Sequence, residues 1–448
     1  MHQADQPHVH TVRRNELRMR IKEQYPTSKQ GAILLCAGFE QERVPFRQES
    51  SFYYLTGITE PGVVMLVDLA GKTTLLVPHC QTNRSKWMKS QIDQIEQSPK
   101  AWGIDEIISL GEALCGFQMH PFSETKHYHD LIARLAQLYN SKYTLFTLAP
   151  NNPHEYVEQR MLLQRLFFWV QGLDRHVQDV SPIVADMRRY KDMSEIEALY
   201  KVIEITILAQ EAAANAIEPG INEAEVQATA EYMMIGSHAR PAFASIIGGG
   251  INSTILHYHA NSEILNKGDL VVVDIGAESD YYCADITRTY PVSGIFNARQ
   301  KELYNIVLAT QEYVADMAHP GMWLSNKDKP QESLHHLAVE FLERKGYGQY
   351  FTHGIGHFLG LDVHDVGDRN EPLDEGDVFT IEPGIYIPAE KTGIRIEDDY
   401  WMTKDGVVCL SDDLPRSVVE IEQLMQSQEE KDSAASRTFS DETEYAQG

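Results

Sequence analysis

The chain has 448 residues, of which 43% are hydrophobic and 23% are charged, a composition typical of a globular protein with more than one hydrophobic core. Its 39 basic and 65 acidic residues give a formal net charge of −26, which argues against nucleic acid or an anionic membrane as a partner. The five cysteines contain no Cys-x-x-Cys pair, so we expect neither a disulfide framework nor a thiolate zinc site.

The N-terminal segment carries charges throughout and lacks the apolar core of a secretory signal peptide. The chain also contains no apolar run of about 18 residues, the length that a membrane span needs. We therefore expect a cytoplasmic protein without a membrane partner.

The first half of the chain reads as an α/β domain covering residues 1–178. Residues 1–10 are expected to be a loose leader, and residues 11–24 a short charged helix. Apolar runs bounded by turn residues then predict buried strands. These runs cover residues 31–38, 50–58, 62–71 and 73–79. A mixed, largely helical stretch follows to about Gly172.

A second domain is expected over residues 179–426. Apolar residues at helical spacing predict helices over residues 194–220, 222–236, 297–318 and 332–347, the second of them capped by Asn222. Short strands are predicted between these helices and again after the last one. Residues 427–448 are polar and rich in serine and glutamate, so we expect them to be disordered.

Two aspartates, Asp274 and Asp285, stand in neighbouring apolar strand-like runs. An antiparallel hairpin with Ser279 and Asp280 at its turn would place them directly opposite each other, with Cβ atoms about 4.5–5.5 Å apart. Two ionised carboxylates that close in a half-buried sheet require a shared proton or a divalent cation.

Three histidines, His353, His357 and His364, follow in the segment THGIGHFLGLDVHDVG. A single histidine is more often an ordinary polar residue than a ligand. Three of them beside glycines, which allow the backbone to approach a ligand closely, are equally compatible with a binding site.

Glu382 and Glu397 complete the set of polar residues in apolar strands. Glu382 ends the run VFTI before a Pro-Gly pair, and Glu397 shares a strand face with Arg395. A salt bridge between Arg395 and Glu397 is the plain alternative, but it leaves Glu382 and the aspartates unexplained.

Carboxylate oxygens with a minority of imidazole suit Mn²⁺, with Co²⁺ or Zn²⁺ as alternatives. Four carboxylates exceed the needs of one ion. Two divalent metal ions about 3.5–4 Å apart, sharing a bridging carboxylate and a bridging water, are the simplest interpretation.

These motifs together resemble the M24 metallopeptidases with the creatinase-like, pita-bread fold, and most of all aminopeptidase P and prolidase. The segments that carry the resemblance are DIGAESDYYCADITRTYPVSGIF, HGIGHFLGLDVHDVG, FTIEPGIYIP, GIRIEDD and ILHYH. In the first half, FRQESSFYYLTGITEPGVVMLVD is similar to the N-terminal domain of those two enzymes. The implied fold class is α/β (α+β), with an N-terminal creatinase-like α/β domain before a C-terminal pita-bread domain.

The resemblance also implies roles for individual residues. The metal ligands would be Asp274, Asp285, His357, Glu382 and Glu397, and the catalytic residues His257, His353, His364, Glu382 and Arg395. Glu382 is expected to accept a proton from the nucleophile, His353 to move a proton or orient the substrate, and His364 or His257 to stabilise the oxyanion. We expect His259 to be a polar neighbour and Cys283 a buried, apolar-like residue.

The implied activity is hydrolysis of the peptide bond that precedes proline, with a peptide carrying proline in its second position as the substrate. The resemblance favours an Xaa-Pro aminopeptidase, with a strict Xaa-Pro dipeptidase (prolidase) as the alternative. A non-catalytic pita-bread module that binds peptides or histones is an alternative of another class, although such modules have lost the ligands that are intact here. The resemblance further implies a homo-oligomer, either a dimer or a tetramer.

Overall fold

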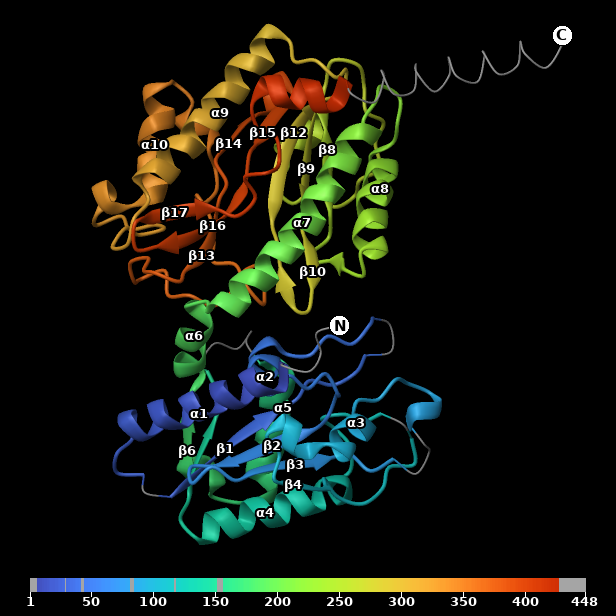
Figure 1. The fold of residues 1–448 in the computed structure, drawn as a ribbon, viewed down its shortest axis with the longest axis vertical. Helices are drawn as coiled ribbons and strands as arrows, with labels where there is room; N and C mark the ends of the chain where they lie inside the picture. The colour runs from blue at the N-terminus through green and yellow to red at the C-terminus, as the bar shows by residue number, and fades with distance from the viewer. Residues whose placement is uncertain are drawn as a thin grey trace, which may run out of the picture. The chain divides into compact units, whose positions relative to one another are not determined.

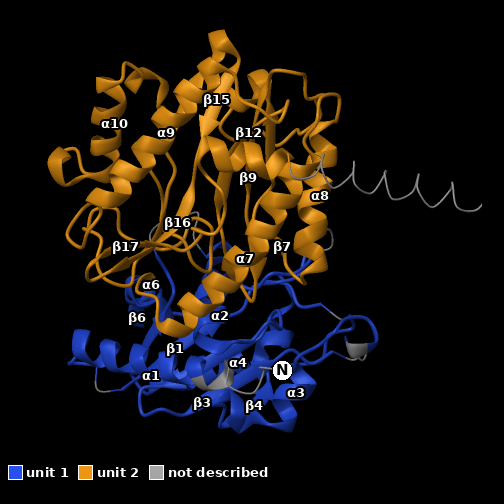
Figure 2. Ribbon diagram, turned by 45° about the horizontal axis from the view of Figure 1, so that its top comes forward, with its two compact units in different colours: residues 1–188 blue, residues 189–448 orange. Residues whose placement is uncertain are grey.

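The computed structural model describes residues 6–426 except 29, 42–43, 81–83, 117 and 151–155. The chain divides into two compact units, residues 1–188 and 189–448 (Figure 2). The sequence placed this boundary after residue 178, and the structure assigns the intervening helix α6 (Ser181–Arg189) almost entirely to the first unit. The predicted disordered tail, residues 427–448, lies outside the described residues.

Unit 1 is built on a six-stranded mixed sheet with the strand order β4-β3-β2-β1-β5-β6 (Figure 1). The strands are β1 (Gly31–Cys36), β2 (Val64–Asp68), β3 (Thr73–Val77), β4 (Glu106–Ser109), β5 (Thr144–Thr147) and β6 (Val177–Asp179). The predicted strands at residues 31–38, 62–71 and 73–79 are therefore confirmed. Leucines of α4 (His129–Asn140) and α5 (Val157–Trp169) pack with the side chains of β1 and β2 in one core cluster.

The predicted strand at residues 50–58 is wrong, because the segment forms helix α2 (Ser50–Thr56). The side chain of Glu49 accepts hydrogen bonds from the backbone of Ser51 and Phe52 and so caps the helix. Gly57 ends it in the left-handed region, with φ of 67°. All residues of α2 are buried, and a short apolar run buried on every side shows no periodicity that separates helix from strand.

Unit 1 also contains the helices α1 and α3. Helix α1 (Gln6–Gln24) begins at residue 6, within the segment for which the sequence predicted a loose leader. Helix α3 (Ile92–Gln97) precedes β4. Among the described residues of the whole chain, no helix combines the length and the apolar character that a membrane span would require.

Unit 2 contains two pairs of packed helices, and all of the predicted helices are confirmed. They are α7 (Met193–Ala216), α8 (Glu223–Gly236), α9 (Ala298–Met317) and α10 (Leu334–Arg344). Helix α7 packs on α8, and α9 packs on α10. Capping boxes begin α7, α8 and α9, formed by Asp192, Asn222 and Asn297 with the residue three positions later.

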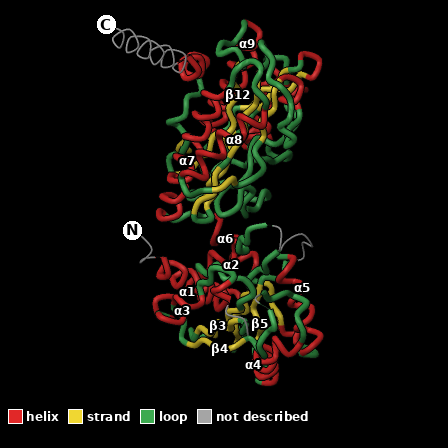
Figure 3. The backbone as a smooth tube through the Cα atoms, turned by 90° about the vertical axis from the view of Figure 1, so that its right-hand side faces the viewer, coloured by secondary structure: helices red, strands yellow, loops and turns green. Residues whose placement is uncertain are grey.

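The strands of unit 2 form small antiparallel sheets beside these helices, as the yellow and red tubes of Figure 3 show. The first half contains β7 (Arg240–Pro241), β8 (Ile246–Gly249), β9 (Leu270–Ile275), β10 (Ala277–Ser279), β11 (Tyr282–Cys283) and β12 (Ile286–Pro291). The second half contains β13 (Val378–Ile381), β14 (Gly384–Ile387), β15 (Thr392–Arg395), β16 (Asp398–Thr403) and β17 (Gly406–Cys409). Helix α7 contacts β9 and β12, whereas α9 contacts β13, β14 and β15. A bridge between Thr287 and Glu397 joins the two halves.

The hairpin that carries the two aspartates has a different register from the predicted one. Asp274 pairs with Thr287, and Asp285 stands just before β12 instead of opposite Asp274. The turn is made by Asp280 and Tyr281, with φ of 51° and 72°, one residue later than predicted. Two positive φ values are what a type I′ hairpin turn requires. Since Asp285 and Thr287 are two residues apart, Asp285 still shares a face with Asp274 as a diagonal neighbour.

Candidate active site

Unit 2 encloses a cavity of about 210 Å³ that brings together all of the residues for which the sequence predicted a catalytic or ligand role. Its lining consists of Leu256, His257, Asp274, Asp285, His353, Gly354, Gly356, His357, His364, Arg369, Glu382, Arg395 and Glu397. These residues come from both halves of the unit, so the cavity lies where the two sets of strands meet.

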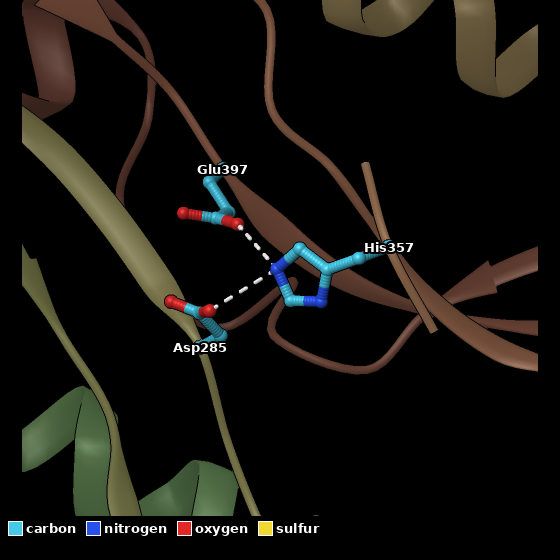
Figure 4. Close-up of side chains that lie close together, drawn as sticks. All are labelled: Asp285, His357 and Glu397. Atoms are coloured by element: carbon cyan, nitrogen blue, oxygen red, sulfur yellow. Dashed lines mark ion pairs between the residues drawn. The ribbon is translucent and has the colours of Figure 1, made fainter. Parts of the chain in front are cut away.

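The tightest cluster in the cavity joins Asp285, His357 and Glu397, as Figure 4 shows. One ligand atom from each lies within 4.8 Å of the others, and all three residues are buried. The Nε2 atom of His357 is 3.3 Å from Oδ2 of Asp285 and 3.9 Å from Oε1 of Glu397. Oε1 of Glu382 also lies 3.9 Å from this nitrogen.

The backbone around His357 is pressed against strand β13. The amide of Thr380 donates to the carbonyl of His357 over 2.9 Å, and the amide of His357 donates to the Thr380 hydroxyl over 3.3 Å. A Cβ atom at Gly356 would lie 1.9 Å from the Thr380 carbonyl oxygen, so only glycine allows this approach. Gly356 thus allows the close backbone approach that places the imidazole among the carboxylates.

The donors and acceptors in the cluster fit a cation. Nδ1 of His357 is 3.1 Å from the Phe358 carbonyl, which can only accept, so Nδ1 is the donor in that contact and Nε2 is the ring atom directed at the carboxylates. One oxygen each of Asp274, Asp285 and Glu397 is buried without a hydrogen-bond partner among the described residues. Buried acceptors that face one another need a positive species between them.

Three carboxyl groups in the cavity have raised pKa values, because they are buried and too little positive charge lies near them. Burial, followed by the repulsion of neighbouring carboxylates, raises the pKa of Asp285 and of Glu397 well above the usual range. Burial also raises the pKa of Glu382 to about 7, although the nearby His357 and Arg395 oppose that shift. A divalent ion would supply the charge that these groups lack.

Arg395 forms an ion pair with Asp274, whereas the alternative that the sequence offered was an ion pair with Glu397. Its Nη2 atom lies 2.5 Å from Oδ2 of Asp274, and among the described residues no ion pair joins it to Glu397. Its Nε atom donates to the Thr287 hydroxyl over 3.2 Å, and that hydroxyl donates to Oε2 of Glu397 over 2.7 Å. Arg395 therefore orients carboxylates in both halves of the cavity.

The remaining histidines surround the cluster. Nδ1 of His353 lies 3.5 Å from Oε2 of Glu382, and burial with the charge of Arg395 lowers the pKa of His353 to about 3. The rings of His357 and His364 have centroids 4.2 Å apart, and partial burial lowers the pKa of His364 to about 4. Both imidazoles are therefore neutral at physiological pH.

His257 reaches the cavity from the loop after the short 3₁₀ helix Gly250–Thr254. The rings of His257 and His259 stack with centroids 6.0 Å apart, and His259 is absent from the cavity lining. Cys283 is buried, and its thiol lies 3.7 Å from the carbonyl oxygen of Leu361. His259 is thus a polar neighbour of the site and Cys283 a buried residue, as we expected from the sequence.

The sequence did not single out three residues that belong to the site. Arg369 lines the cavity, Tyr386 lies between His353 and Arg395, and Thr287 joins Arg395 to Glu397. Strand alternation is the signal that could have found two of them: Thr287 shares a face with Asp285, and Tyr386 shares a face with Gly384 on a strand that begins after Glu382.

Comparison with known proteins adds two family matches. Residues 197–404 match metallopeptidase family M24, and residues 10–116 match the N-terminal domain of aminopeptidase P. The Xaa-Pro aminopeptidase of Haemophilus influenzae is 30% identical over 88% of this chain and 93% of its own length. The Xaa-Pro dipeptidase of Pyrococcus furiosus is 40% identical, but over 51% of this chain and 64% of its own length.

Among solved structures, proline aminopeptidase P II from Yersinia pestis superposes with a TM-score of 0.77 at 27% sequence identity. The match covers 94% of this chain and 99% of that one. Both units of the present chain therefore have counterparts in one known protein.

Proposed function

This chain belongs to metallopeptidase family M24, and we propose that it removes the N-terminal residue from peptides whose second residue is proline. The observation that carries the proposal is the convergence of His357 with Asp285, Glu382 and Glu397 in one cavity of a chain that matches aminopeptidases over most of its length. The chain therefore acts as an Xaa-Pro aminopeptidase.

The ligands that we propose for two divalent ions are Asp274, Asp285, His357, Glu382 and Glu397. Their oxygen-rich chemistry favours Mn²⁺, with Co²⁺ or Zn²⁺ as alternatives. When bound, such ions supply Lewis acidity, which lowers the pKa of a coordinated water and polarises a carbonyl oxygen.

The residues around the ligands have separate proposed roles. Glu382, which lies in the cavity beside His353 and His357, is suited to accept a proton from the attacking water and to return it to the leaving nitrogen. His353, next to Glu382, orients the substrate or moves that proton. His364 and His257 line the cavity and donate hydrogen bonds to the oxyanion. Arg395 acts through Asp274 and Tyr386, which it holds in place.

The nitrogen of proline carries no hydrogen, so an Xaa-Pro bond requires a site that needs no hydrogen bond from that nitrogen. A site that demands a hydrogen bond from the nitrogen of the scissile peptide bond would reject an Xaa-Pro bond. We propose that part of the histidine segment, including Gly354 and Gly356, lines the space for the proline ring.

A strict Xaa-Pro dipeptidase is the second candidate. The 40% identity with the Pyrococcus furiosus enzyme favours it, but that match covers only about half of the chain. The longer match to the Haemophilus influenzae aminopeptidase favours the first candidate.

The deciding assay compares Gly-Pro, Gly-Pro-Gly and a longer Gly-Pro peptide in the presence of Mn²⁺, with Gly-Ala-Gly as the matched control. We expect release of glycine from the longer Gly-Pro peptides and no release from Gly-Ala-Gly. Hydrolysis of Gly-Pro alone would identify a dipeptidase. Binding of Gly-Pro-Gly by a metal-loaded chain without any hydrolysis would identify a non-catalytic module.

Two expectations about the whole protein stay predictions. We propose a cytoplasmic location and a dimer or tetramer, and light scattering on the purified full chain measures the oligomeric state directly.

A further inference from the structure

Two buried glutamines occupy equivalent positions in the two halves of unit 2. Gln210 lies in the C-terminal half of α7, and its amide nitrogen donates to the carbonyls of Val273 and Ile286 over 3.1 and 2.7 Å. Val273 directly precedes Asp274, and Ile286 directly follows Asp285. A single side chain thus holds the backbone beside both aspartates.

Gln311 does the same in the second half, from the C-terminal half of α9. Its amide nitrogen donates to the carbonyls of Ile381 and Ile396 over 3.1 and 3.4 Å. These residues directly precede Glu382 and Glu397. The same nitrogen lies 3.0 Å from Oδ2 of Asp398, on strand β16.

Both glutamine side chains are buried. Gln210 and Gln311 are 0% and 1% exposed, so neither amide exchanges its partners for water. The hydroxyl of Tyr290 donates to Oε1 of Gln210 over 3.1 Å, which sets the orientation of that amide. Figure 1 shows the two helices that supply them, α7 and α9, on the two sides of unit 2.

We propose that Gln210 and Gln311 are positioning residues that set the spacing of the two carboxylates in each half of the metal centre. The proposal rests on the ligand assignment made above. The carboxylates of each pair lie on or next to two strands that the backbone ladder already pairs, β9 with β12 and β14 with β15. Each glutamine adds a side-chain tie between the two segments at the residues adjoining the carboxylates. Gln210 ties the segments of Asp274 and Asp285, and Gln311 ties those of Glu382 and Glu397.

This role differs from ordinary core packing in a measurable way. A residue that only stabilises the fold changes the melting temperature and leaves the metal affinity of the folded protein unaltered. A residue that spaces the ligands changes the metal affinity itself. Groups that orient metal ligands from outside the coordination sphere typically contribute a factor of about 10–100 in affinity.

The test replaces each glutamine with methionine, which has a similar length and no amide. Thr310→Val is the matched control, because Thr310 is buried on α9 and its hydroxyl donates to the Ile306 carbonyl of the same helix. Metal-free full-length protein is titrated with Mn²⁺ and the free ion is followed by electron paramagnetic resonance. The melting temperature of each metal-free protein is measured in parallel.

We expect Gln210→Met and Gln311→Met to weaken Mn²⁺ binding by about 10–100-fold. Excess Mn²⁺ should restore kcat while KM for an Xaa-Pro peptide stays unchanged. Thr310→Val should bind Mn²⁺ as the wild type does, whatever its melting temperature.

Mn²⁺ affinity within twofold of the wild type in both methionine variants would overturn the proposal and leave the glutamines with a packing role. If a methionine variant does not fold, the shorter Gln→Asn replacement at that position is expected to weaken Mn²⁺ binding, and unchanged affinity there overturns the proposal equally. The wild-type arm, repeated with Co²⁺ and Zn²⁺, tests the proposed function separately, since a wild-type chain that binds none of the three ions overturns both.

Discussion

Nε2 of His353 lies 2.8 Å from the hydroxyl oxygen of Tyr386. That oxygen also accepts a hydrogen bond from Nη1 of Arg395 over 3.1 Å, so the Tyr386 proton is directed toward His353. Nδ1 of His353 lies 2.8 Å from the Gly354 carbonyl, which can only accept. His353 is therefore held as the neutral tautomer with its proton on Nδ1, the nitrogen that lies near Glu382.

Removal of this imidazole tests its role in proton transfer. We expect His353→Ala to lower kcat by a factor on the order of 10² or more, which is typical for loss of an acid–base group. Tyr386→Phe should lower kcat less, since it removes only one of the two hydrogen-bond partners that fix the tautomer. Steady-state kinetics at saturating Mn²⁺ measure both effects, and a wild-type rate in His353→Ala would remove His353 from the mechanism.

Replacement of a cluster carboxylate tests the metal assignment. Asp285→Asn keeps the shape of the side chain but removes its charge, so we expect loss of bound metal and of Xaa-Pro turnover. The metal-free variant should be no less stable than the metal-free wild type, because a buried carboxyl without sufficient partners has been removed. Elemental analysis and thermal denaturation measure the two results. Full metal content together with full activity would contradict the assignment.

Metal-free protein should lose stability as the pH rises above about 6.5. The pKa values of Asp285 and Glu397 are raised, and that of Glu382 is raised to about 7, so the folded state binds more protons than the unfolded state. The free energy of unfolding then falls as the pH rises through these values. His353 and His364 have lowered pKa values and act in the opposite sense, but only below their ordinary value of 6.5.

Melting temperatures of chelated protein across this range measure the effect. Saturating Mn²⁺ should abolish the decline, and Glu382→Gln should make the metal-free decline shallower. A melting temperature that rises with pH above 6.5 in the chelated wild type would refute the explanation.

Glu223 should affect turnover through His257. Its carboxylate is 0% exposed and accepts hydrogen bonds from the Gly249 amide over 2.8 Å and from the Tyr258 hydroxyl over 2.9 Å. The amide of Glu263 also donates to it over 2.9 Å. Glu223 thus fixes both ends and the middle of the loop that carries His257.

We expect Glu223→Gln to lower kcat/KM by about tenfold, because a small misplacement of a catalytic group slows the reaction even when the changed residue lies outside the site. In a His257→Ala background the same change should have little further effect. A double-mutant cycle measures this coupling, with Tyr258→Phe as the milder variant. Fully additive effects would show that Glu223 does not act through His257.

Features that depend on neighbouring residues could be predicted from the amino-acid sequence. The cap at Asn222 and the apolar spacing of the long helices set α7, α8 and α9, because these signals act within one or two turns. The placement of Glu397 beside Arg395 in an apolar strand also marked them as residues that need partners.

The partners of these residues could not be predicted from the sequence, because they come from segments that meet in the folded chain. Arg395 pairs with Asp274, 121 positions away, instead of with Glu397, and Asp274 stands opposite Thr287 instead of Asp285. The apolar run at Ser50–Thr56 forms a helix where the sequence predicted a strand. The prediction failed because a segment buried on all sides shows no periodic pattern of apolar and polar residues. Local patterns report the repeat of the backbone, whereas ion pairs, register and burial depend on segments that meet only in the folded chain.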